Sequence, residues 1–195
     1  MKTNAFLLSL ILSLSCGNAF ASTTEAENFL KKSVGEVVEA AKNAKDAPAL
    51  ASAVRPILLK TISFDAMTRR AVGPGWRQFT DAEQKDAIGF FTTLIIRTYS
   101  AKFTPGELPD VLYKAATETA PGRVEVATTT LYKGSRYEVV YRLEQPEGKG
   151  WRVTDVVIEG VSMIANYRGQ LDAQFKSGGA GAVLGSLQKS IDSSK

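Results

Sequence analysis

The feature that most constrains the fold is a run of four strand-like segments in the second half of the chain. Each segment is rich in β-branched and aromatic residues; they are Val111–Thr117, Val124–Tyr132, Tyr137–Leu143 and Trp151–Ile158. The turn signals between them are short, as in Pro121-Gly122 and Lys133-Gly134-Ser135. Connections this short join antiparallel neighbours. The sequence therefore predicts a curved antiparallel sheet of approximately four strands.

Helical patterns flank this sheet on both sides. Before it, apolar residues recur at helical spacing from Phe29 to Ala41, Asp46 before Pro48 predicts a new helix start, and Arg55-Pro56 predicts an interruption. Thr80-Asp81-Ala82-Glu83 is a capping box that predicts a long helix over 81–102. After the strands, a helix over 162–175, a glycine-rich joint over 178–181 and a last helix follow. This order of elements predicts an α+β domain.

The first residues have the three-part layout of a secretory signal. Lys2 precedes an apolar run over 5–14, and Ala19-Phe20-Ala21 fits a signal-peptidase site. We predict a cleaved segment 1–21 and a single secreted, periplasmic domain over 22–195. A retained membrane anchor is the first alternative, but the apolar run is about half of the roughly 20 residues that a span needs. Lipoprotein acylation at Cys16 is the second alternative, although Ser13 stands three positions before the cysteine, where lipoprotein signals usually have leucine.

Two absences narrow the range of functions. The chain has no histidine, and Cys16 is its one cysteine. Histidine-dependent nucleophilic catalysis and histidine-containing zinc sites are therefore excluded. We find no metal, P-loop or dinucleotide motif, so we expect no catalytic residue, metal or cofactor. The net charge of +4 is spread along the chain without a basic stripe, which argues against a nucleic-acid partner.

Three stretches together resemble the MlaC family, also called the toluene-tolerance periplasmic lipid-binding family. They are Phe64–Gly73 followed by Trp76, Phe91–Tyr99, and Trp151–Arg168. The last is the most specific, because it reads W-x-V-x-D-V-x-x-E-G-V-S-x-x-x-N-Y-R. The likeness extends over nearly all of the chain after the signal segment.

The resemblance implies helices wrapped on an antiparallel sheet, with an apolar cavity between them that holds acyl chains. It also implies a soluble carrier that moves phospholipid between an inner-membrane ABC transporter complex and an outer-membrane complex, and so serves outer-membrane lipid asymmetry. A hopanoid-associated branch of the family is an alternative, in which the cargo is a hopanoid or another apolar lipid. We expect a monomer that meets membranes through these partners.

The predicted lipid-binding wall combines the apolar face of the sheet with the apolar stripe of the long helix. Its candidate residues are Phe91, Leu94, Ile95, Val124, Val126, Val139, Tyr141, Val153 and Ile164. Each of them taken singly also fits an ordinary core position, so the lipid claim depends on the resemblance. Arg69, Arg70 and Arg77 fit a phosphate headgroup, a partner's acidic surface or a plain solvated face.

Asp155 is the polar residue for which the sequence allows the most roles. One role is a catalytic carboxylate pair with Glu159. We expect instead that Asp155 is hydrogen-bonded, with Tyr167 or Arg168, and orients the helix that follows the sheet. A ketosteroid-isomerase-like enzyme would use Asp155 as a base and Tyr141 as a donor in an apolar pocket. A purely structural interaction protein is the third class.

Overall fold

The computed structural model describes residues 16–104, 106–146 and 150–193. Residues 1–15, and with them most of the predicted signal segment, lie outside the described residues, whereas 16–21 form the start of the first helix. No helix in the described part of the chain is long and apolar enough to cross a membrane.

Two of the helices before the sheet begin at residues that carry capping signals. In chain order they are α1 (Cys16–Ala41), α2 (Ala47–Thr61), α3 (Phe64–Val72), the 3₁₀ helix η1 (Gly73–Gln78) and α4 (Asp81–Ser100). The Asp46 carboxylate accepts a hydrogen bond from the Ala49 amide at 2.7 Å, which caps α2. At α4, Thr80 and Glu83 form both halves of the capping box. Both predicted helix starts are confirmed.

The predicted interruption at Arg55-Pro56 is wrong. Pro56 lies inside α2, which continues to Thr61. Proline lacks the N–H that would bind the carbonyl of Ser52, but Ser52 is on the exposed side of the helix, where water can bind that carbonyl. Burial of Leu50 and Val54 on the opposite side then holds the helix together.

The strands form one antiparallel sheet, which confirms the predicted pairing. They are β1 (Asp110–Tyr113), β2 (Thr117–Ala120), β3 (Arg123–Tyr132), β4 (Ser135–Glu144), β5 (Arg152–Ile158) and β6 (Val161–Ser162). The order across the sheet is β1-β3-β4-β5-β6, and β2 also pairs with β3. The first predicted segment, Val111–Thr117, is thus divided between β1 and β2, which pair with different parts of the same edge of β3.

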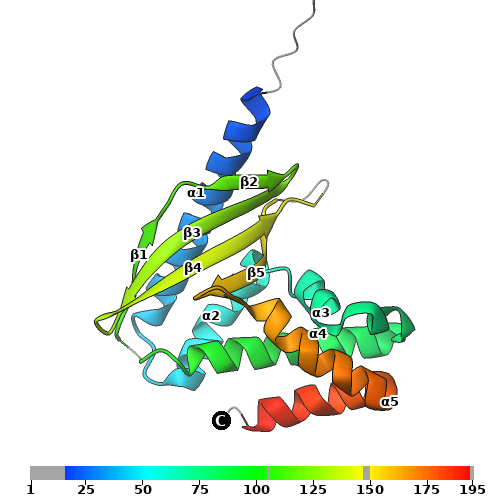
Figure 1. Cartoon of the computed structure of the whole chain (residues 1–195). Helices are drawn as coiled ribbons and strands as arrows, with labels where there is room; N and C mark the ends of the chain where they lie inside the picture. Colours follow the sequence, from blue (N-terminus) through cyan, green and yellow to red (C-terminus); the bar gives the residue numbers. More distant parts are fainter. Residues whose placement is uncertain (1–15, 105, 147–149, 194–195) are drawn as a thin grey trace, which may run out of the picture.

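The chain ends in α5 (Met163–Ser193), which contains a sharp kink. Gly178 and Gly179 have non-helical backbone angles there, and the positive φ of 64° at Gly179 favours glycine. The predicted glycine-rich joint is therefore confirmed, and the last arm of α5 turns back at this point (Figure 1).

Apolar side chains gather in two clusters, and Ile62 and Val156 pack against both of them. One cluster joins α2, α3, α4 and α5 around Phe91 and Leu187. The other lies between α1 and the sheet, around Leu30 and Val126. Figure 1 shows α1 crossing the sheet at one end of the molecule and the later helices gathered at the other. The predicted α+β class, with helices wrapped on a curved antiparallel sheet, is confirmed.

Candidate ligand cavity between the sheet and the helices

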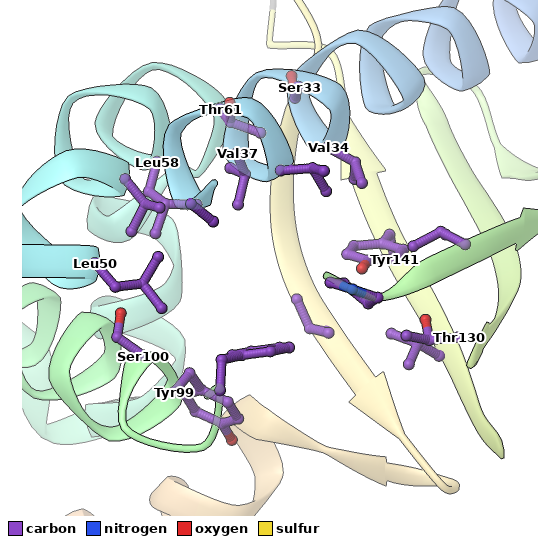
Figure 2. Close-up of a pocket in the computed structure, with 18 of the residues that line it drawn as sticks. Ser33, Val34, Val37, Leu50, Leu58, Thr61, Tyr99, Ser100, Thr130 and Tyr141 are labelled. Carbon is purple, nitrogen blue, oxygen red and sulfur yellow. The ribbon is translucent and has the colours of Figure 1, made fainter. Parts of the chain in front are cut away.

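A cavity of about 300 Å³ lies between the sheet and helices α1, α2 and α4 (Figure 2). Its walls are almost entirely apolar. Among the described lining residues, Glu107 is the one with a carboxylate side chain. The helical wall consists of Leu30, Ser33, Val34, Val37, Val38, Ala41, Leu50, Val54, Leu58, Thr61, Ile62, Ile95, Tyr99 and Ser100. The sheet contributes Val111, Thr130, Val139, Tyr141, Val153, Val156 and Ile158.

The sheet side of the cavity follows from strand alternation and one irregularity. On β4, Val139 and Tyr141 share a face because side chains alternate with a period of two. On β5 the register shifts between the pairs Arg142↔Asp155 and Leu143↔Val153, which leaves Thr154 as an extra residue. This bulge places both Val153 and Val156 in the cavity wall.

The cavity opens to solvent at one place. Its exposed lining residues are Phe103, Gly106, Glu107 and Leu108, and all of them belong to the connection between α4 and β1. Elsewhere in the lining, Leu30 and Val153 are only 1% and 2% exposed. The α4–β1 connection is therefore the mouth of the cavity.

Tyr141 supplies a hydroxyl to this apolar cavity (Figure 2). Burial, with a smaller contribution from Tyr113, raises the pKa of Tyr141 to about 12. Burial also raises the pKa of Tyr99, and the nearby Tyr167 and Asp155 act in the same direction. Both phenols therefore stay neutral at physiological pH and can donate a hydrogen bond, but neither is poised as a base.

Four of the predicted lipid-binding residues lie in the cavity wall: Ile95, Val139, Tyr141 and Val153. The other five, Phe91, Leu94, Val124, Val126 and Ile164, do not line this cavity. Phe91 and Leu94 belong instead to the core between the helices. There the Phe91 and Tyr167 rings pack edge to face, with their centroids 5.2 Å apart.

The other three residues lie outside the cavity wall for a similar reason. Val124 and Val126 are on the cavity face of the sheet, but they are packed beneath α1 with Leu30, so α1 fills the space above them. Ile164 follows the sheet and is packed against the helical cluster. Sequence periodicity identifies a buried face correctly but does not tell whether a helix or a cavity lies against it.

The wall residues that the sequence analysis missed come mainly from α1, α2 and the mouth. The apolar stripe of α1 was recognised as one face of a helix, and Val34, Val37 and Val38 on that stripe line the cavity. The mouth residues Phe103 and Leu108 had no periodic signal, because they lie in a connection.

Asp155 lies on the opposite face of the sheet from the cavity. It is 5% exposed, and its Oδ1 accepts hydrogen bonds from the amides of Val156 at 2.9 Å and Ile164 at 3.2 Å. Its Oδ2 accepts from Ser162 Oγ at 2.6 Å and from Arg142 Nη1 at 3.0 Å. These partners, rather than the predicted Tyr167 or Arg168, fix the start of α5 relative to the sheet.

The enzyme-like arrangements considered from the sequence are not brought together. Asp155 lines a polar cleft on the back of β5, whereas Tyr141 lines the apolar cavity. Glu159 lies in the turn after β5, where its Oε1 accepts from the Glu138 amide at 2.6 Å. Of the predicted arginines, Arg70 binds Glu144 through two contacts of 2.7 and 2.9 Å. The described residues include no group of three acidic, cysteine or histidine side chains suited to a metal.

A largely apolar cavity between a curved sheet and helices is typical of proteins that bind an apolar ligand. The model of the MlaC protein family matches residues 31–189, and the chain therefore belongs to the MlaC family.

A solved structure similar to this chain is that of the phospholipid-binding protein from Ralstonia solanacearum in complex with a phospholipid. The two chains are 25% identical and superpose with a TM-score of 0.80, over 87% of this chain and 98% of the other. None of the curated proteins matches the chain.

Proposed function

We propose that this protein is a periplasmic carrier that encloses the acyl chains of a phospholipid in the cavity between the sheet and α1, α2 and α4. The observation that carries the proposal is the cavity itself, whose walls are almost entirely apolar and which opens at a single described segment. Membership of the MlaC family and the similar phospholipid-bound structure support the choice of ligand.

The energetics favour a dry cavity over a few polar contacts. A phospholipid with about 32 acyl carbons would lose on the order of 25 kcal/mol on exposure to water, at roughly 0.8 kcal/mol for each CH₂. A carrier has to offset nearly all of this cost. An apolar cavity replaces the bilayer interior with a similar environment, so transfer from membrane to protein is close to neutral and the lipid can leave again.

The size of the cavity suggests that it widens when it is loaded. At about 300 Å³ it lies at the lower end of the roughly 300–1,000 Å³ typical of ligand sites. A diacyl lipid is large for such a site. We therefore infer that acyl chains enter through the α4–β1 connection and push that segment outward.

The proposed route runs between an inner-membrane ABC transporter complex and an outer-membrane complex. The predicted secretory signal and the family membership support this route. We further propose that the protein acts as a carrier and not as an enzyme, because Asp155 and the cavity residue Tyr141 lie on different faces of the sheet.

The test is to purify the secreted protein, extract it with organic solvent and identify the ligand by mass spectrometry. We expect diacyl phospholipid at close to one molecule per protein. A hopanoid in its place would assign the protein to the hopanoid-associated alternative. Protein that contains no lipid, and that takes up no fluorescent phospholipid from vesicles, would contradict the proposal.

A further inference from the structure

The mouth of the cavity is held by residues that do not line it. The tip of the β3–β4 hairpin consists of Tyr132, Lys133, Gly134 and Ser135, with Tyr132 paired to Ser135. Lys133 and Gly134 have positive φ values of 51° and 74°, as a tight two-residue hairpin turn requires. Figure 1 shows this tip beside the end of α4 and the start of β1. The tip is therefore a tight hairpin turn that lies next to the mouth.

Tyr132 contacts the mouth in two ways. Its hydroxyl accepts a hydrogen bond from the Thr104 amide at 2.6 Å. Its ring packs edge-on against the Phe103 ring, with centroids 5.2 Å apart. Thr104 and Phe103 both line the cavity, whereas Tyr132 is outside its wall. Tyr132 thus ties two lining residues to the hairpin.

Lys133 adds polar contacts to the same segment. Its ammonium group donates a hydrogen bond to Thr104 Oγ1 and lies 3.5 Å from Glu107 Oε2. The same ammonium is 5.7 Å from the centroid of the Tyr132 ring. Residues on both sides of position 105 are therefore tied to one turn.

The ion pair between Lys133 and Glu107 can be broken at low cost. The Lys133 and Glu107 side chains are 48% and 52% exposed, so water screens their attraction. The strands of the sheet wall cannot separate without breaking the backbone hydrogen bonds between them, and the helical walls are packed into two buried apolar clusters. The mouth is consequently the part of the wall that opens at the lowest cost.

We propose that Tyr132 and Lys133 form a clasp that holds the mouth closed and sets the rate at which lipid enters and leaves. This inference rests on the proposed carrier function. The two residues act by positioning Phe103, Thr104 and Glu107, without touching the lipid themselves. Release of the clasp lets Phe103, Thr104 and Glu107 move away from the hairpin tip, and their return encloses the acyl chains.

The main test replaces the ion pair with a reversible covalent link. The sequence after Ala21 has no cysteine, so the double variant Glu107→Cys/Lys133→Cys carries a unique pair for a bifunctional methanethiosulfonate reagent. Transfer is followed between phosphatidylethanolamine–phosphatidylglycerol vesicles with a self-quenched NBD-labelled phospholipid. We expect cross-linking to slow transfer at least tenfold, and dithiothreitol to restore it. Without the cross-link, the variant should transfer lipid about two- to fivefold faster than the wild type.

A matched control pair is available on α5. Asp172 and Lys176 form an exposed ion pair of 2.6 Å away from the cavity. The variant Asp172→Cys/Lys176→Cys, cross-linked in the same way, should transfer lipid at the wild-type rate. For the hydroxyl, Tyr132→Phe should accelerate transfer, whereas Tyr137→Phe on the same hairpin should not.

The outcomes separate the clasp from the carrier function. Equal transfer rates before and after complete cross-linking, together with an unchanged rate for Tyr132→Phe, would overturn the clasp and leave the carrier function in place. A wild-type protein that moves no phospholipid in this assay would overturn the carrier function, and the clasp with it.

Discussion

Replacing Asp155 with asparagine should lower the stability of the protein and leave its bound lipid in place. Asparagine has nearly the same shape as aspartate, and its carbonyl oxygen can still accept from the Val156 and Ile164 amides. Its amide nitrogen cannot accept from Arg142 or from Ser162 Oγ, as Asp155 Oδ2 does. The change therefore removes two hydrogen bonds to a carboxylate oxygen, one from Arg142 and one from Ser162, at a site that is 5% exposed.

The expected loss is about 1–3 kcal/mol, because removing an acceptor from a buried group leaves its donors unsatisfied. For a domain of this size, about 2–4 °C in Tm corresponds to each kcal/mol. We therefore predict a fall of roughly 2–12 °C. The cavity is on the other face of β5, so the lipid content at a permissive temperature should be unchanged.

The matched control is Glu125→Gln. Glu125 is the other carboxylate bound by Arg142, at 2.9 Å from its Nε, but its side chain is 37% exposed. Loss of a surface ion pair costs about 0–1 kcal/mol, so this variant should melt close to the wild type. Thermal melting and lipid extraction are measured on the same preparations. An unchanged Tm for Asp155→Asn, with loss of turnover of a small substrate, would refute the structural role.

Three further predictions concern the cavity and the secreted chain. Ile95→Asp should abolish lipid co-purification, because an unpaired carboxylate in an apolar wall is costly. Thr93→Asp on the same helix is the control, and circular dichroism checks the fold of both variants. A folded Ile95→Asp variant with normal lipid content would show that Ile95 does not contact the lipid. Tyr141 has a pKa raised to about 12, so its contribution to stability is present below pH 10 and is lost as the pH rises towards 12. An ultraviolet titration should show a tyrosine that titrates at about pH 12 and that Tyr141→Phe lacks, and no difference between the two would contradict this. The secreted protein should begin at Ser22 by intact mass, and a mass that includes an acylated Cys16 would disprove cleavage there.

The parts of the fold that follow from local signals were predictable from the sequence. The capping box at Thr80 and Glu83, the Asp46 cap and the glycine joint each satisfy backbone groups within a few residues. The antiparallel pairing followed from the short turns. The division of the first strand into β1 and β2 was not predictable, because it depends on how two separate segments share the edge of β3.

The cavity wall was only partly predictable, for a different reason. Val126 and Val139 both lie on the apolar face of the sheet, yet α1 covers Val126 and the cavity lies against Val139. The bulge at Thr154, which turns Val156 into the cavity and Asp155 out of it, leaves no clear mark in the sequence. Residues at the mouth, such as Leu108, have no periodic pattern at all. These features depend on tertiary packing, which periodicity does not encode.

The most direct test of the proposed carrier function is to map where the acyl chains lie. The protein is loaded with a diacyl phospholipid that carries a diazirine near the end of one chain, irradiated, digested and analysed by mass spectrometry. We predict cross-links to cavity residues such as Val34, Val54 and Ile95, and their loss when unlabelled phospholipid is in excess. Cross-links confined to the polar cleft around Asp155, or to the outer surface, would contradict the proposal that this cavity carries the lipid.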